Sequence, residues 1–189
     1  MLKYVVLAGF LALVAYIDIK SKKILNVFLI AMAFIGIVVN IFSFIIDSYK
    51  ISDLIFLIEY QKSLDITDIL LGIIIPLLAL MPLWLIKALG AGDIKLLMVA
   101  GIYLGTDIIL VAIYAFFIAA FVGIMLLVKE SKLVKRIFFA LRYSALLINS
   151  KKAVVYEYGI DNLNAVTVPF AACVFVAYLT YVLFVVIGG

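Results

Sequence analysis

Two aspartates, Asp18 and Asp93, are the side chains of this sequence best suited to catalysis. Asp93 follows Gly-Ala-Gly in the stretch 90–95 and precedes an apolar segment, while Asp18 follows the first apolar segment. A charged side chain at bilayer depth costs roughly 2.5 to 3.5 kcal/mol on insertion scales, so it is a functional candidate by default. Two carboxylates that face one water can divide the work, because the charged one activates the water and the protonated one polarises a carbonyl. Such a dyad hydrolyses a peptide bond without a metal or a covalent intermediate.

The rest of the side-chain inventory leaves few alternatives to carboxylate chemistry. Histidine is absent, and the single cysteine is Cys173. A His-Glu-x-x-His zinc site, a Ser-His dyad and a Cys-x-x-Cys zinc clip cannot be built from these residues. We therefore expect no metal and no cofactor, and we interpret Cys173 as a small buried hydrophobic residue.

The elements that must position the two aspartates are membrane helices. The 189 residues are 69% hydrophobic and 14% charged, with a mean hydropathy of +1.39, which lies outside the range of soluble domains. This length leaves room for about six spans of ~20 residues and for no separate soluble domain. We expect an all-α polytopic membrane protein with a single domain, residues 1–189. Its net charge of +4 then reflects basic cytoplasmic loops rather than nucleic-acid binding.

Six apolar stretches predict six transmembrane helices with both termini on the outer side. They cover residues 2–17, 24–46, 69–86, 94–105, 108–128 and 165–187. The first lacks a small-x-small cleavage site at its end, so we expect a retained helix rather than a signal peptide. Lys20, Lys22 and Lys23 follow it, and residues 129–164 hold seven basic against three acidic side chains. Both basic regions are expected to be cytoplasmic.

Two shorter segments between the spans are expected to lie along the membrane surface. Residues 51–60 are apolar but too few to span the bilayer. Residues 133–148 mix basic with apolar side chains, a pattern typical of an interfacial amphipathic helix on anionic lipid. This second segment lies on the cytoplasmic side, between the fifth and sixth spans.

The fourth apolar stretch is too short to cross a bilayer. From Ile94 to the polar break at Gly105 there are about twelve residues, or ~18 Å of helix, against a hydrocarbon core of ~30 Å. Asp93 should therefore lie within the thickness of the membrane, at the mouth of a water-filled cavity open to the cytoplasm. We expect the stretch 89–92 to be non-helical, because irregular backbone at that depth is tolerated where it lines a cavity.

Each motif residue also has a purely structural interpretation. Gly-x-Gly-Asp before an apolar helix is typical of a helix capped by Asp93, and Asp18 can be an acid at the membrane surface beside Lys20. Gly90 and Gly92 can serve close backbone approach or a simple loop. Gly101 and Gly105 can form a small-x-x-x-small face for helix packing. Lys95 can be a snorkelling cation or a charge near Asp93, and Asn26 can cap a helix.

Three separated motifs resemble those of the GxGD aspartyl proteases, specifically the type IV prepilin peptidases and their archaeal preflagellin peptidase relatives. The first motif is Asp-Ile-Lys-Ser-Lys-Lys-Ile-Leu-Asn, residues 18–26. The second is Gly-Ala-Gly-Asp-Ile-Lys-Leu-Leu, residues 90–97, followed by Gly101 and Gly105. The third is Val-Pro-Phe, residues 168–170, which is similar to a late Pro-Phe element of the family. The resemblance follows the chain in order over essentially its whole length.

The resemblance implies an aspartic endopeptidase in the plasma membrane of a prokaryote, with its active site facing the cytoplasm. Its partners would be the lipid bilayer and the pilin-like or archaellin precursors whose short basic leader it removes. Asp18 and Asp93 would form the dyad, and Asn26, Gly90, Gly92 and Lys95 would position the dyad or the substrate.

The sequence departs from the family pattern at two places. Leu25 stands where many members have proline, which affects the geometry expected near Asn26. The cysteine-bearing cytoplasmic insert of the larger bacterial members is missing, so we expect no N-methyltransferase activity.

Other classes of function fit parts of the same pattern. Two intramembrane acids and a broken helix also suit a small ion-coupled transporter, although the sequence has no inverted repeat. In a non-enzymatic subunit of a pilus or secretion machine, the acids would only fix helix packing. Among enzymes, presenilin-like cleavage within the membrane is a further possibility, against which the basic turn after Asp18 argues.

Overall fold

The structure is a computed structural model that describes residues 2–21, 26–48, 64–86, 88–129 and 168–187. These residues form α-helices and no strand. The helices are α1 (Leu2–Ser21), α2 (Asn26–Ser48), α3 (Ile66–Leu85), α4 (Ala91–Leu104), α5 (Ile108–Lys129) and α7 (Phe170–Tyr181). A 3-10 turn, Gly105–Asp107, joins α4 to α5, and a π-helical segment, Val182–Ile187, extends α7. Within the described part of the chain, the predicted all-α class is confirmed.

The helices have the length and composition of membrane spans. Four segments are long and apolar enough to cross a bilayer: Lys3–Ser21, Asn26–Ile45, Ile66–Leu85 and Ala91–Leu126, the last of which contains both α4 and α5. Phe170–Phe184 is a shorter apolar helix. These segments fit a multi-pass membrane protein, whereas the number of six spans and their orientation stay predictions.

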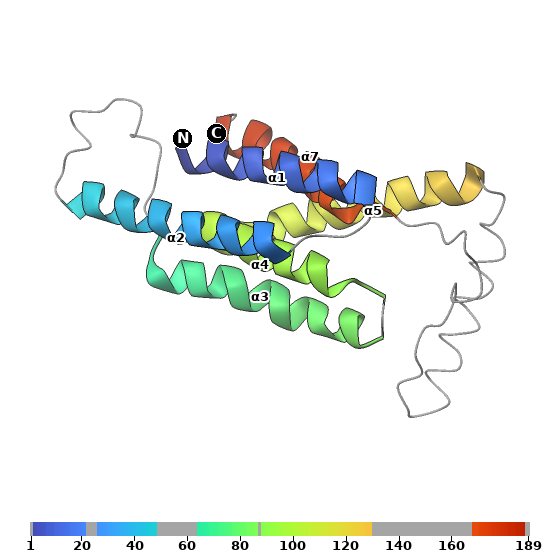
Figure 1. Cartoon of the computed structure of the whole chain (residues 1–189), viewed down its shortest axis with the longest axis horizontal. Helices are drawn as coiled ribbons and strands as arrows, with labels where there is room; N and C mark the ends of the chain where they lie inside the picture. The colour runs from blue at the N-terminus through green and yellow to red at the C-terminus, as the bar shows by residue number, and fades with distance from the viewer. Residues whose placement is uncertain (1, 22–25, 49–63, 87, 130–167, 188–189) are drawn as a thin grey trace.

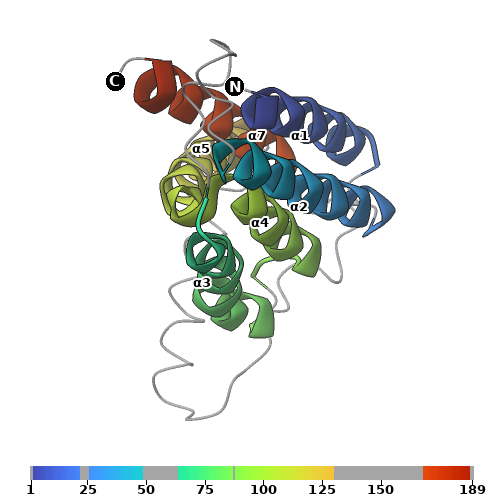
Figure 2. The ribbon, with the colours of Figure 1, turned by 90° about the vertical axis from the view of Figure 1, so that its left-hand side faces the viewer.

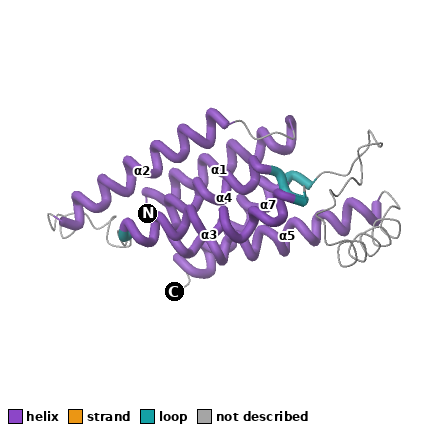
Figure 3. Tube along the Cα trace, turned by 90° about the horizontal axis from the view of Figure 1, so that it is seen from below, coloured by secondary structure: helices purple, strands orange, loops and turns teal. Residues whose placement is uncertain are grey.

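Successive helices run alternately in opposite directions (Figure 1). As a result, the end of α1 and the starts of α4 and α7 lie at one end of the bundle. The start of α1, the α4–α5 turn and the end of α7 lie at the other. Seen from its left-hand side (Figure 2), the bundle has α4 near its centre, packed against α3 and α2, while α7 packs against α1 and α5. Figure 3 shows how little of the described chain is loop.

Helix α4 forms the core of this arrangement. From Ile94 to Leu104 most of its side chains are buried, and Leu96, Leu97, Ala100 and Tyr103 are fully so. A helix that is apolar and buried on all sides belongs to the interior of a large bundle. By contrast, α2, α3 and α5 expose large apolar side chains along their length, a surface suited to lipid. The helix that carries Asp93 is therefore held by protein on most sides.

The backbones of α3 and α4 touch at two glycines. A Cβ atom built on Gly101 would collide with the carbonyl group of Gly72, so neither position has room for a side chain. Gly105 ends α4 with φ +61°, a left-handed conformation that glycine adopts at little cost. The packing role expected for Gly101 is confirmed, and its partner in α3 is Gly72.

Two predicted boundaries are wrong. Helix α1 continues through Asp18 to Ser21, because residues 18–21 contain no glycine or proline to end it. Helix α4 begins at Ala91, with Gly90 as its N-cap, so of the expected non-helical stretch 89–92 the first two residues are non-helical and the last two belong to the first turn of α4. Helix α7 begins at Phe170, and the predicted start of the sixth span at residue 165 lies outside the described residues.

Two further expectations agree with the structure, and two others concern segments outside the described residues. The 14 residues of α4 span ~21 Å, which is still short of a ~30 Å core. Cys173 is buried, as expected. The two predicted surface segments, 51–60 and 133–148, lie outside the described residues.

Candidate active site

Asp18 is buried at the junction of two helices. It lies in the last turn of α1, its exposed fraction is 8%, and its Oδ2 accepts a 3.0 Å hydrogen bond from the backbone N–H of Ala171. Ala171 is the second residue of α7, so the carboxylate lies among the free N–H groups of a helix N-terminus, where negative charge is favoured. The alternative interpretation of Asp18, an acid at the membrane surface beside Lys20, stays open, but the side chain is buried within the protein.

The Val-Pro-Phe element forms the other half of this junction. Pro169 is the N-cap of α7 and makes no side-chain cap of its own, so Asp18 supplies the cap from α1. Phe170 follows it, and the ring centroids of Phe170 and Phe116 of α5 lie 5.2 Å apart. This aromatic contact anchors the first turn of α7. The start of α7, where Ala171 lies 153 positions after Asp18, thus orients the Asp18 carboxylate.

Asp93 lies in the first turn of α4, third after the N-cap Gly90. Its carboxylate turns back over the start of the helix and accepts a hydrogen bond from the backbone of Gly90. A Cβ atom on Gly90 would lie 3.0 Å from the Oδ2 atom of Asp93. An acid that reaches back from this position to the N-cap amide is one half of a capping box. Asp93 therefore caps α4 as expected, but it does so from the third helical position and not as the N-cap residue.

The two carboxylates belong to the same end of the bundle. Asp18 ends α1 and Asp93 begins α4, and the two are close enough for their charges to interact. Each has its own backbone donor, Ala171 for Asp18 and Gly90 for Asp93. Two acids at one end of the bundle, each with a backbone donor, are candidates for an acid–base pair.

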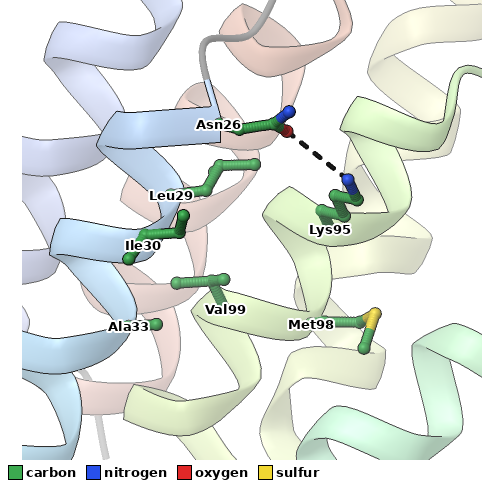
Figure 4. Close-up of a pocket in the computed structure, with 7 residues that line it drawn as sticks. All are labelled: Asn26, Leu29, Ile30, Ala33, Lys95, Met98 and Val99. Atoms are coloured by element: carbon green, nitrogen blue, oxygen red, sulfur yellow. Dashed lines mark hydrogen bonds between the residues drawn. The ribbon is translucent and has the colours of Figure 1, made fainter.

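Of the four other predicted site residues, Gly90, Gly92 and Lys95 lie at the start of α4, and Asn26 begins α2. The ammonium group of Lys95 donates a 3.4 Å hydrogen bond to the Oδ1 atom of Asn26, the first residue of α2. Figure 4 shows these two side chains reaching toward one another between α2 and α4. Gly90 contacts Asp93 directly, and Gly92 lies partly buried in the first turn of α4. Within the described residues, no group of three or more His, Cys, Asp or Glu side chains could hold a metal ion.

Two polar side chains that fasten α2 to α4 were not predicted. The Nδ2 group of Asn40 donates to the carbonyl oxygens of Gly36 (2.9 Å) and Ile102 (2.8 Å). The Tyr103 hydroxyl donates to the carbonyl oxygen of Met32 at 2.6 Å. An amide inside an apolar span needs such partners, so Asn40 could have been recognised from the sequence as a packing contact.

A second polar cluster at the far end of the bundle was also missed. The Tyr181 hydroxyl donates to the Oδ2 atom of Asp107 at 2.7 Å, and the Tyr178 hydroxyl donates to the carbonyl oxygen of Tyr4 at 2.7 Å. These bonds join α7 to the α4–α5 turn and to α1. Helices α1 and α7 are therefore bonded to each other at both ends.

Comparison with known proteins decides the family. The sequence profile described as the type IV leader peptidase family matches residues 5–128. The chain belongs to the type IV leader peptidase family. The matched region of this family member includes Asp18, Asn26 and the stretch 90–95, and it ends before the Val-Pro-Phe element. No curated protein and no solved structure matches the chain.

Family membership confirms the resemblance inferred from the motifs. Together with the apolar helices, it makes the chain a multi-pass membrane protein of a protease family. The contact between Asp18 and Ala171 lies partly outside the matched region, so it is an independent observation that the late element belongs to this site.

Proposed function

We propose that this protein is a membrane aspartic endopeptidase that removes the short basic leader from prepilin-like or preflagellin precursors. Cleavage takes place at the cytoplasmic face of a prokaryotic plasma membrane, on a water activated by Asp18 and Asp93, and no N-methyltransferase activity accompanies it. The observation that supports this proposal is that the two acids lie at the same end of the bundle, each with its own backbone donor.

The two carboxylates have different surroundings, which assign the role of base to one and the role of acid to the other. Asp18 faces the N-terminus of α7, which favours a negative charge, so Asp18 is the base that takes a proton from the water. Asp93 then carries the shared proton, since two close carboxylates do not both ionise readily. It donates that proton to the carbonyl oxygen of the scissile peptide bond.

The reaction is balanced by these two groups alone. The water oxygen attacks the carbonyl carbon while Asp18 takes the water proton and Asp93 gives its proton to the carbonyl oxygen. In the resulting gem-diol the C–N bond breaks, the leaving amine takes the proton from Asp18, and one hydroxyl returns a proton to Asp93. Both carboxyl groups end as they began.

The first prediction concerns the two acids. In membranes that contain pilin-like and archaellin-like precursors, Asp18→Asn and Asp93→Asn are each expected to lower the rate of leader removal about 10²- to 10⁴-fold, the usual contribution of general acid–base catalysis. The measurement is the shift of the precursor band to the mature size at equal expression. The precursor that is cut by the wild type also identifies the substrate class.

The matched control is Asp107→Asn, at the far end of the bundle. An asparagine there still offers an oxygen to the Tyr181 hydroxyl, so cleavage should continue at the wild-type rate. Cleavage that survives Asp18→Asn or Asp93→Asn would contradict the aspartyl mechanism and return these acids to a packing or ion-conducting role.

A further inference from the structure

A groove runs along the surface of the bundle between α2 and α4. Its volume is ~360 Å³, and its lining residues are Asn26, Leu29, Ile30, Ala33, Lys95, Met98 and Val99. Leu29 is buried, while Ile30 at the rim has an exposed fraction of 69%. Figure 4 shows Asn26 and Lys95 reaching toward one another at one end, with Leu29, Ile30 and Val99 beyond them. This α2–α4 groove is therefore apolar along its length and polar at one end.

The apolar end of the groove is closed by a hydrogen bond between the two helices. The Tyr103 hydroxyl of α4 donates to the carbonyl oxygen of Met32 of α2 at 2.6 Å. Both residues adjoin the lining, because Met32 precedes Ala33 and Tyr103 lies one turn after Val99. The groove therefore ends part-way along α2 and does not follow the whole length of the two helices.

The polar end lies where a bilayer has its headgroups. Asn26 is the first residue of Asn26–Ile45, a segment with the length and composition of a membrane span, so it belongs at one surface of the hydrocarbon core. Ala33 follows seven residues later, or ~10.5 Å deeper along the helix. The Lys95 side chain reaches Asn26 from α4, as a lysine does when its charge moves toward the interface. The groove thus runs from the headgroup region into the region of the acyl chains.

The charge at the polar end is positive. Lys95 is exposed, and it is the one charged side chain among the described residues that line the groove. Asp93, two positions earlier on α4, lies about 200° around the helix and is not part of the lining. The Lys95 ammonium group has three donors, one of which faces the Asn26 Oδ1 atom, and the Asn26 amide nitrogen has two more. An anion with several acceptor oxygens complements such a group of donors.

We propose that the α2–α4 groove binds one anionic phospholipid, with its phosphate on Lys95 and Asn26 and an acyl chain along Leu29 and Ile30. Such a lipid combines both features of the groove at the right depth, because its phosphate lies at the surface of the hydrocarbon core and its chains run inward. A helix of another protein would need an acid at that same level. A basic peptide would meet Lys95 as a like charge. The lipid site is separate from the proposed peptidase activity and does not depend on it.

A fluorescent reporter in the groove tests the proposal. The one tryptophan of the sequence is Trp84, so Ile30→Trp in a Trp84→Phe background leaves a single tryptophan, at the rim of the groove. In vesicles of phosphatidylcholine and phosphatidylglycerol, with one of the two brominated, quenching of this tryptophan measures which lipid lies beside it. We expect phosphatidylglycerol to bind about fivefold more strongly, the attraction of one basic residue for anionic lipid. The matched reporter is Phe117→Trp on α5, where the side chain is 71% exposed and outside the groove, and it should show no preference.

Substitutions of Lys95 assign the preference to its ammonium group. With the reporter at position 30, Lys95→Gln should abolish the preference for phosphatidylglycerol, and Lys95→Arg, which keeps the charge, should retain it. The matched control is Lys129→Gln, because Lys129 is an exposed lysine at the end of α5 and outside the groove. This variant should keep the fivefold preference. Inorganic phosphate added at constant ionic strength should change nothing, because it has no acyl chain.

Three results would overturn the proposal. Equal quenching by the two lipids at position 30 would mean that the groove holds ordinary bilayer lipid. Quenching by neither lipid would mean that another segment of protein covers the groove. Loss of the preference on addition of inorganic phosphate would mean that Lys95 binds a free anion. None of these measurements involves leader removal, so the lipid site and the proposed peptidase activity stand or fail separately.

Discussion

At the scale of single residues, the two candidate catalytic acids differ in what holds them. Asp18 is bound by the amide of Ala171 from another helix, whereas Asp93 is bound by Gly90 at the start of its own helix. A capping acid and a catalytic acid are therefore compatible here, because the cap fixes the carboxylate orientation that the chemistry needs.

Gly90→Ala should disturb Asp93 without straining the backbone. The φ and ψ angles of Gly90, −74° and 142°, are allowed for alanine, but the new Cβ would lie 3.0 Å from the Asp93 Oδ2 atom and push the carboxylate aside. We expect kcat for leader removal to fall about 10- to 100-fold, as measured in the membrane cleavage assay.

Gly9→Ala in α1 is the matched control, because a Cβ there meets nothing within 4 Å. Its kcat should equal that of the wild type. Equal rates for Gly90→Ala and Gly9→Ala would show that the position of the Asp93 carboxylate does not limit cleavage.

At the scale of secondary structure, α4 is the element that makes the site. It is short, buried on most sides, and ended by a positive-φ glycine at Gly105, and the depth of its first turn in the membrane stays a prediction. Its closest contact is with α3, at Gly101 and Gly72. This contact holds the helix that carries Asp93 close against α3.

Gly101→Ala should separate α3 from α4. The new Cβ would overlap the Gly72 carbonyl group, which is backbone and cannot rotate away, so we expect a loss of about 1–3 kcal/mol in the free energy of unfolding. Thermal unfolding in detergent micelles measures this loss as a lower midpoint.

Gly123→Ala in α5 provides the comparison, because its Cβ would meet its nearest neighbour, Val168 Cγ2, at an ordinary 3.5 Å. This variant should be as stable as the wild type or slightly more so. If Gly101→Ala unfolds at the same temperature as Gly123→Ala, the close approach of α3 and α4 is not tight in the membrane protein.

At the scale of the whole molecule, the two ends of the bundle carry different sets of polar side chains. One end holds Asp18 and Asp93, and the other holds the hydrogen bonds of Tyr181 to Asp107 and of Tyr178 to Tyr4. Because the second set lies at the opposite end from the two aspartates, we expect it to contribute to stability and not to cleavage.

Tyr181→Phe should therefore change stability and leave cleavage intact. Removal of the hydroxyl leaves the Asp107 carboxylate without its 2.7 Å donor, at an expected cost of about 1.5–3 kcal/mol for a hydrogen bond to a charged group. Tyr114→Phe, on the more exposed α5 face, should cost nothing measurable. A fall in kcat for Tyr181→Phe that stability does not explain would contradict the separation of the two ends.

The sequence alone was sufficient for the class of fold and for the family. The apolar stretches, the single glycine-flanked acid and the shortness of the segment after it are local properties, and they predicted membrane helices, Asp93 and a short fourth helix. The family profile covers the same motifs. Boundaries were less predictable, since Asp18 and Asp93 proved to be helical where a glycine or a polar run suggested an end.

What the tertiary structure decided is which helix faces meet. The bond from Ala171 to Asp18 joins residues 153 positions apart, Gly101 needs Gly72 as a partner, and Asn40 and Tyr103 bond α2 to α4. In an almost wholly apolar chain, hydrophobic periodicity carries little information about facing, because lipid-facing and buried sides are equally apolar. Close backbone contacts and rare polar bonds make that choice, and they exist only once the helices are packed.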